Sequence, residues 1–162
     1  MEKHIISILV ENQSGVLSRI SGLFSRRGYN IDSLSVGETE DPKRSRITVA
    51  VTGDGMVIDQ ITNQLRKLID TVEVAKLSAD DSVRRELALI KINALTEKRA
   101  EIVGIVDIFR AKIIDVAANT VIAEITGETS KVDAFIKIVE PYGIIEIART
   151  GLTALARGVS NL

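Results

Sequence analysis

The sequence predicts an α+β protein in which one order of elements, strand–helix–strand–strand–helix–strand, occurs twice in tandem. Short stretches rich in Ile and Val, bounded by turn residues, alternate with longer stretches whose apolar residues have helical spacing. A polar segment at residues 79–84 separates two halves that show this same order. Few residues are identical between the halves, so what repeats is the order of elements.

The first strand is predicted at HIISILVE, residues 4–11. Apolar residues occur at both alternating sets of positions in this strand, so we expect both of its faces to be covered. The next segment has apolar residues at the i, i+1, i+4, i+7 and i+8 positions of an amphipathic helix, namely Val16, Leu17, Ile20, Leu23 and Phe24. Arg26 and Arg27 suit the last turn of this helix, and Gly28 suits a left-handed residue after it.

Two further strands are predicted at NIDSLSVGE (30–38) and RITVAVT (46–52), with Pro42 in the turn between them. A second helix follows, whose apolar stripe consists of Val57, Ile58, Ile61, Leu65, Leu68 and Ile69. The strand TVEVAKL (71–77) completes the unit. This βαββαβ order is the ferredoxin-like arrangement, in which two helices cover one face of a four-stranded antiparallel sheet. We therefore expect a first domain at residues 1–78.

After the predicted linker at 79–84, the second half repeats the order, and we expect a second ferredoxin-like domain at 85–162. Its strands are predicted at ELALIKINA, AKIIDVAA, TVIAEITG and GIIEIART, and its helices by the stripes Ile102, Val103, Val106, Phe109 and Val132, Phe135, Ile136, Val139. The tail GLTALARGVSNL (151–162) is expected to be loosely held.

Composition argues against several classes of function. A net charge of −1 over 162 residues does not favour a general polyanion binder. The absence of cysteine excludes disulfides, thiolate metal sites and a cysteine nucleophile, and the single histidine, His4, is interpreted as a surface residue at a strand end. Asp80 and Asp81 are interpreted as solvated residues of the linker. No nucleophile elbow, phosphate-binding loop or dinucleotide fingerprint occurs, so catalysis is not indicated.

Membrane insertion and nucleic-acid binding are not indicated either. No apolar run approaches the ~18 residues of a membrane span, and the N-terminus lacks the pattern of a signal peptide, so we expect a cytoplasmic protein. RNA-recognition domains share the βαββαβ order, but they stack bases on aromatic residues of their central strands. The corresponding strands here, HIISILVE and RITVAVT, contain no aromatic residue.

The loop between the first strand and the first helix, Asn12 to Gly15, is a candidate binding site. The first N–H groups of a helix lack helical partners and favour an anion, and glycine lets a ligand approach the backbone closely. Asn12 and Asn30, which we expect to lie beside the start of the helix, offer amide oxygens to an ammonium group. Such a site fits an α-amino acid. An alternative is that Ser14 caps the helix and Gly15 only eases the turn.

The second half helps to weigh these alternatives. At the same place it reads INALTEKRAEIV (92–103), without a glycine. This indicates that folding alone does not require the glycine, and it favours a binding role for the first loop.

The residues resemble a known family. ILVENQSGVLSRISGLFSRRGYNIDSLSVGETEDPKRSRITV is similar to the N-terminal ACT domain of the regulatory, or small, subunit of acetolactate (acetohydroxyacid) synthase. The stretch NQSGVLSRISGLFSRRGYNI is especially specific, and ALIKINA, IFRAKIIDV and EIARTG resemble the C-terminal domain. The similarity extends over essentially all of the chain.

The resemblance implies a chain without catalytic activity, which binds a large subunit that condenses two pyruvates, or pyruvate and 2-oxobutyrate. Thiamine diphosphate, magnesium and FAD belong to that large subunit, and no cofactor is expected in this chain. The small subunit raises activity and confers inhibition by an end product of branched-chain amino acid synthesis, usually valine. The resemblance also implies that the C-terminal domain provides much of the contact with the large subunit.

The resemblance further implies a homodimer formed edge to edge through the ACT domains, with the effector at their interface. By match to the family's loop, the site is lined by Asn12, Gly15, Val16 and Leu17, with Asn30 and Ile31 contributed from the second strand of the partner subunit. A different hypothesis, a free-standing amino-acid sensor that acts on another target such as a transcription factor, is distinguished by the absence of a complex with the large subunit.

Overall fold

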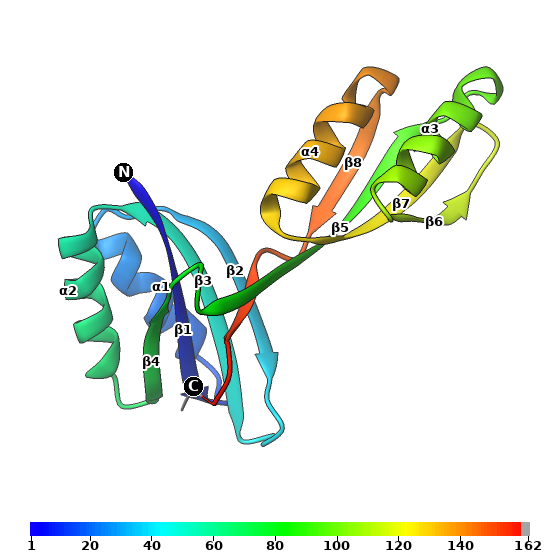
Figure 1. The fold of residues 1–162 in the computed structure, drawn as a ribbon. Coiled ribbons are helices and arrows are strands. Elements are labelled where there is room, and N and C mark those ends of the chain that lie inside the picture. Colours follow the sequence, from blue (N-terminus) through cyan, green and yellow to red (C-terminus); the bar gives the residue numbers. More distant parts are fainter. Residues whose placement is uncertain (160–162) are drawn as a thin grey trace. The chain divides into compact units, whose positions relative to one another are not determined.

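The computed structural model describes residues 1–159, which form two compact units. Unit 1 contains Met1–Arg84 and the described residues 152–159, and unit 2 contains Arg85–Gly151. Each unit has helices on one face of an antiparallel sheet, as Figure 1 shows. The predicted fold class, two tandem ferredoxin-like βαββαβ units, is therefore confirmed.

Unit 1 has a four-stranded sheet in the order β2-β3-β1-β4, with every neighbouring pair antiparallel. Its elements in chain order are β1 (Glu2–Glu11), α1 (Val16–Arg26), β2 (Ile31–Glu38), β3 (Arg44–Gly53), α2 (Gly55–Arg66) and β4 (Thr71–Leu77). Gly28 follows α1 with a φ of 72°, as predicted. α2 ends before the end of its predicted stripe, and Ile69 is therefore fully exposed rather than packed.

Unit 2 repeats the arrangement with the strand order β6-β7-β5-β8. Its elements are β5 (Ser82–Asn93), α3 (Thr96–Ile108), β6 (Lys112–Val116), β7 (Thr120–Gly127), α4 (Thr129–Val139), the short 3₁₀ helix η1 (Glu140–Tyr142) and β8 (Ile144–Arg149). β5 begins at Ser82, inside the predicted linker at 79–84, whereas the two compact units divide between Arg84 and Arg85. Ser82 is buried there and its hydroxyl donates to the carbonyl of Ser78.

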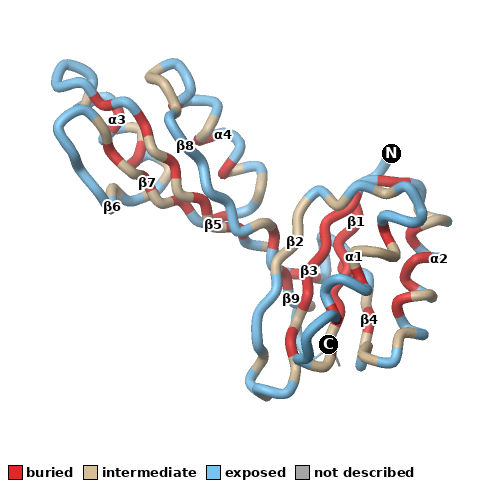
Figure 2. The backbone as a smooth tube through the Cα atoms, turned by 180° about the vertical axis from the view of Figure 1, so that it is seen from behind, coloured by how far each residue is buried: buried red, intermediate tan, exposed pale blue. Residues whose placement is uncertain are grey.

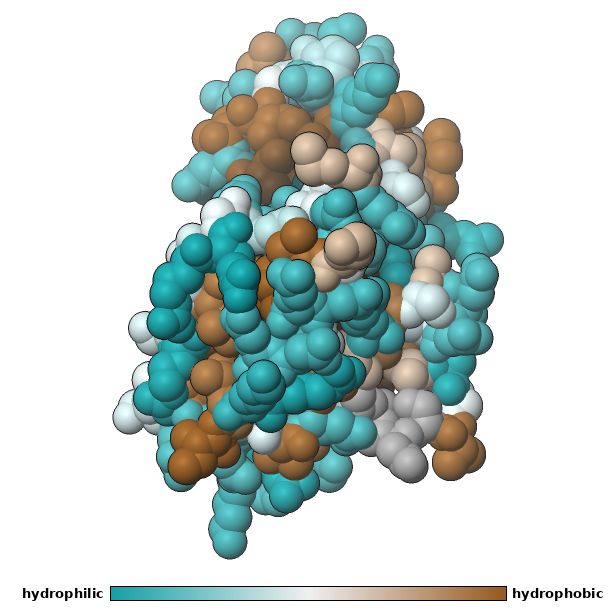
Figure 3. Space-filling view, turned by 90° about the vertical axis from the view of Figure 1, so that its left-hand side faces the viewer, coloured by the Kyte–Doolittle hydropathy of each residue, from teal (hydrophilic) through white to brown (hydrophobic). Residues whose placement is uncertain are grey.

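Each core lies between the sheet and the helices of its own unit, as the buried residues in Figure 2 show. In unit 1 the inward residues of β1 pack against Val16, Ile20 and Phe24 of α1. In unit 2 the rings of Phe109 and Phe135 meet edge to face at 5.4 Å. Hydrophilic side chains dominate the surface view of Figure 3, as expected when the apolar stripes face inward.

The C-terminal segment packs on unit 1, which corrects the prediction of a loosely held tail in the second domain. Leu152 is only 4% exposed and Ala154 is 3% exposed, and they contact Ile5, Ala50 and Leu77 on the sheet face opposite the helices. β9 (Thr153–Ala156) also pairs with β5. The segment is held because it covers apolar residues of that face, and both faces of β1 are covered as predicted. Residues 160–162 of the predicted tail lie outside the described residues.

Candidate functional site

The start of α1 is formed by a left-handed glycine. Gly15 is the N-cap residue, with φ 86° and ψ −13°, and no side chain caps the helix. The alternative prediction, in which the side chain of Ser14 caps the helix, is therefore wrong. Within residues 1–159, no side-chain hydrogen bond caps the N–H groups of the first helical turn, and this turn contains no acidic residue.

The backbone conformation at position 15 itself favours glycine, which the sequence comparison of the two halves did not predict. A φ of 86° is strained for a residue with a Cβ. At the corresponding place in unit 2, Leu95 has φ −58° and ψ 149°, so its loop takes a different path into α3. The lack of glycine in unit 2 therefore does not show that folding can dispense with Gly15.

Arg19 places a positive charge beside this helix start, and sequence reasoning did not single it out. Nη1 of Arg19 lies 3.3 Å from where a Cβ on Gly15 would be. The guanidinium is held there by an ion pair with the carboxylate of Asp70, whose side chain is 12% exposed. An anion at the helix start would therefore meet N–H groups and a guanidinium together.

Asn12 connects the end of β1 to the turn between β2 and β3. Its main-chain N–H donates to the carbonyl of Lys43 at 2.8 Å, and its Nδ2 donates to the carbonyl of Pro42 at 3.0 Å and to Oε1 of Glu38 at 3.2 Å. The NH₂ group is thus engaged in the fold. What Asn12 offers to a ligand is its Oδ1 oxygen, an acceptor suited to an ammonium group.

Val16 and Leu17 differ in what they offer. The side chain of Val16 belongs to the core and the residue is only 4% exposed, so it faces the loop with its main chain. Leu17 is 42% exposed and presents its side chain at the surface of the first turn. The sequence had placed both in one apolar stripe.

Asn30 and Ile31 lie at the other end of the same sheet. In the β2–β3 ladder Ile31 is opposite Val51, whereas in the β1–β3 ladder Glu11, next to Asn12, is opposite Arg44. At ~3.3 Å per residue along β3, the two places are roughly 20 Å apart. The expectation that Asn30 of the same chain lies beside the start of α1 is wrong, because β2 begins where α1 ends.

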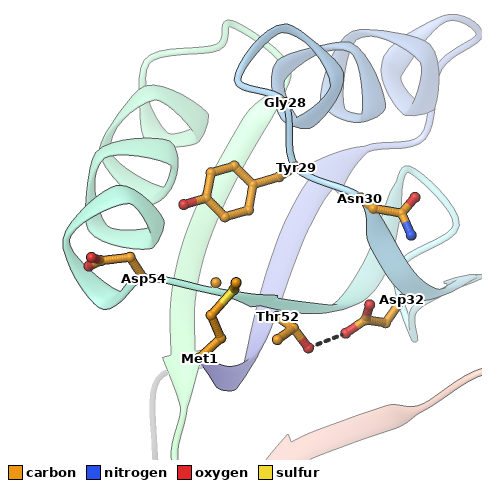
Figure 4. A pocket seen from close by; sticks show the side chains of 8 residues that line it. Met1, Gly28, Tyr29, Asn30, Asp32, Thr52 and Asp54 are labelled. Atoms are coloured by element: carbon orange, nitrogen blue, oxygen red, sulfur yellow. Dashed lines mark hydrogen bonds between the residues drawn. The ribbon is translucent and has the colours of Figure 1, made fainter.

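A shallow depression of about 700 Å³ surrounds Asn30. Figure 4 shows Tyr29 and Asp54 on one side of it and Asn30 and Asp32 on the other. Most of its polar groups serve the fold: Thr52 donates to Asp32 at 2.7 Å, and Asp54 caps α2 by accepting from the N–H of Met56 at 2.8 Å. The amide of Asn30 points away from the Tyr29 ring.

The remaining candidates do not form a reactive centre. His4 is buried, with Nε2 3.3 Å from the carbonyl oxygen of Gly53, so its interpretation as a surface residue is wrong. Asp80 and Asp81 lie exposed in the turn before β5. Within residues 1–159, no three His, Cys, Asp or Glu side chains come together as a metal site. Nor is any helix in that range long and apolar enough to cross a membrane.

Comparison with known proteins defines the class of unit 1. Residues 6–73 match a family model described as an AHAS (acetohydroxyacid synthase) small subunit-like ACT domain. Residues 85–158 match a model described as the small subunit of acetolactate synthase. The fold, the open start of α1 and the first match together define unit 1 as an ACT domain, and they support a regulatory role for the chain.

Relatives of similar length extend this result to the whole chain. A probable acetolactate synthase small subunit of Archaeoglobus fulgidus is 52% identical over 96% of this chain and 98% of its own length. The acetolactate synthase small subunit of Bacillus subtilis is 48% identical over 98% of this chain and 93% of its own. The crystal structure of the acetolactate synthase small subunit from Thermotoga maritima superposes with a TM-score of 0.91 at 44% identity, over 99% of this chain and all of that one. The chain belongs to the acetolactate synthase small-subunit family.

Proposed function

We propose that this chain is the non-catalytic regulatory subunit of an acetolactate synthase. It activates the large catalytic subunit and confers feedback inhibition by a branched-chain amino acid, for which we expect valine. The observation that carries this proposal is the uncapped start of α1 at Gly15 with the Arg19 guanidinium fixed beside it, in a chain of this family. Thiamine diphosphate, magnesium and FAD are assigned to the large subunit.

The site needs a second copy of the chain, and the sheet offers an edge for it. β2 is an edge strand, and Val36 on it is half exposed although it lies opposite the core residue Ile47. Open edges and exposed apolar residues are liabilities unless they are paired. Antiparallel pairing of two β2 strands about a two-fold axis sets the start of one against the end of the other.

Such a homodimer brings together what a single chain keeps apart. Glu38, at the end of β2, accepts from Asn12 and so marks the sheet end where α1 starts. In the dimer, Asn30 of the partner subunit and Ile31 of the partner subunit come to this end. The partner therefore supplies the second asparagine oxygen and an apolar wall, and the site is incomplete without it.

The groups match an α-amino acid. Its carboxylate meets the N–H groups at Val16 and Leu17 and the guanidinium of Arg19, while its ammonium meets the asparagine oxygens. A sub-millimolar effector needs about 4–6 kcal/mol. The helix terminus supplies ~1–2 kcal/mol, and burial of the valine side chain supplies ~1.5–3 kcal/mol. Hydrogen bonds to the charged groups add ~1.5–3 kcal/mol each, which offsets the cost of association.

The test is to add the purified chain to purified catalytic subunit and to follow acetolactate formation with and without valine. We expect the chain to raise the rate and valine to lower it again. If the two proteins form no complex at micromolar concentration and the rate does not change, the proposal is refuted. Valine binding in calorimetry without any such complex would instead support a sensor that acts on another target in the cytoplasm.

A further inference from the structure

The return segment Leu152–Arg157 is anchored at both of its ends within unit 1. At its start, the N–H of Leu152 donates to Oγ of Ser33 at 3.3 Å, and the carbonyl of Leu152 accepts from Oγ of Ser35 at 3.2 Å. At its other end, the N–H of Arg157 donates to the carbonyl of Asp81 at 2.7 Å. Between these anchors the segment lies on apolar residues of the sheet.

The two serines make β2 the element that holds Leu152. Residues i and i+2 of a strand point to the same face, so Ser33 and Ser35 together grip both polar groups of the Leu152 main chain. Opposite them on β3 lie Ala50 and Thr48, whose small side chains let the segment approach the sheet closely. We call this pair of hydrogen bonds the serine clamp.

The serine clamp lies next to the proposed effector site. Ser33 is two residues after Ile31, and the β2–β3 register shifts between these two residues. A register irregularity is a place where a strand can adjust its path. An effector held by Asn30 and Ile31 therefore acts on β2 directly beside the clamp.

The clamp is also one residue from unit 2. Leu152 follows Gly151, the last residue of that unit, and only Thr150 and Gly151 separate it from the end of β8 at Arg149, so little chain is available to absorb a displacement of Leu152. The other passage of the chain between the units, at Arg84 and Arg85, lies inside β5. A shift of β2 is thereby passed along the main chain into β8.

We propose that the segment Leu152–Arg157 is a tether, through which the effector-binding strand β2 controls unit 2. This inference rests on the proposed function, because it gives the route by which effector binding changes the activity of the catalytic subunit. Regulation requires that the effector bind two states of the chain differently, and the clamp is the contact that differs between them.

The test uses the full chain in complex with its catalytic subunit and compares three proteins: wild type, Ser33→Ala/Ser35→Ala, and the control Ser21→Ala/Ser25→Ala. The control also removes two serine hydroxyls that donate to main-chain carbonyls at 3.2 Å, but within α1. Calorimetry measures valine binding, hydrogen exchange follows residues 152–157, and acetolactate formation gives the inhibition.

We expect all three proteins to bind valine with similar affinity and to activate the catalytic subunit. In wild type and control, valine slows exchange in residues 152–157; in the clamp variant it does not, and the fraction of activity that saturating valine removes falls by about five-fold. Full inhibition of the clamp variant, or unchanged exchange in wild type that binds valine, overturns the tether alone. Absence of valine binding to wild type overturns the proposed function and the tether together.

Discussion

Replacing Gly15 with alanine separates what this residue does for folding from what it does for binding. The residue has a φ of 86°, and holding a non-glycine residue in the left-handed region costs about 1–2 kcal/mol. The new Cβ also lies 3.3 Å from Nη1 of Arg19, closer than ordinary contact, so the guanidinium has to move. We expect the melting temperature to fall by about 2–8 °C and valine affinity to fall at the same time.

Gly28 provides the matched control. It has a φ of 72° at the other end of α1, and a Cβ there would have no atom within 4 Å. Gly28→Ala should therefore lower the melting temperature by a similar amount while valine affinity stays at the wild-type value. Differential scanning calorimetry and titration calorimetry measure the two effects. If Gly15→Ala binds valine as tightly as Gly28→Ala does, the assignment of the effector to the start of α1 is refuted.

Three further predictions concern the tail, the second unit and the dimer. Leu152→Ala should lower the free energy of unfolding by about 2–4 kcal/mol in urea titrations, because the side chain is buried against the sheet. Lys91 lowers the pKa of Glu146 below its ordinary 4.5, mainly through their hydrogen bond. The folded wild-type chain is therefore stabilised at neutral pH and loses this stabilisation as the pH falls through the lowered pKa, whereas Lys91→Gln should lack it at every pH. Asn12→Ala and Asn30→Ala should each abolish valine binding. A mixed dimer with one chain of each variant holds one site with both asparagines and one site with neither, so it should bind valine at half of its sites.

Each of these predictions has an outcome that contradicts it. A loss below about 0.5 kcal/mol for the tail variant would mean that the segment is loosely held after all. An unchanged pH profile would mean that the exposed Lys91–Glu146 pair is screened by solvent. No recovery in the mixed dimers would mean that both asparagines act in one chain, which contradicts a site shared between two subunits.

The secondary structure could be predicted because apolar spacing is local. The stripes of α1 and α2 and the alternation in β3 follow directly from which faces are buried. β9 was missed because the apolar alternation that begins just before it, Leu152, Ala154 and Ala156, is short and made mostly of small residues. The face that it covers includes Ile5, which is at the opposite end of the sequence, and only the folded chain brings them together.

The candidate site was predicted in part. The loop at Gly15 was proposed from residue types, and its binding role stays a prediction, but the position of Arg19 depends on Asp70, which is 51 residues away in the sequence. A signal did exist, since a basic residue in the first turns of a helix is unfavourable unless something compensates for it. The misplacement of Asn30 was avoidable, because a strand that follows a helix starts at the end of that helix.

Unit 2 provides a built-in comparison for the proposed site. Arg99 lies four residues after the N-cap Leu95 of α3, as Arg19 lies four residues after Gly15. Its Nη2 donates to the carbonyls of Ala94 at 3.0 Å, Ala117 at 3.0 Å and Ala118 at 2.8 Å. In unit 2 the arginine at this helix position therefore binds main-chain carbonyls of the neighbouring loops.

This difference predicts how many effector molecules bind to each chain. The guanidinium of Arg99 already donates to three main-chain carbonyls and so holds the loops that carry them. An incoming carboxylate would have to replace these carbonyls, and their hydrogen bonds would be lost. In unit 1 the guanidinium is paired with one carboxylate, and the N–H groups of the helix start have no side-chain cap. Calorimetry should therefore give one valine per chain, and Arg99→Lys should leave that value unchanged. Two molecules per chain would show that the repeated fold, rather than the loop at Gly15, is what binds the effector.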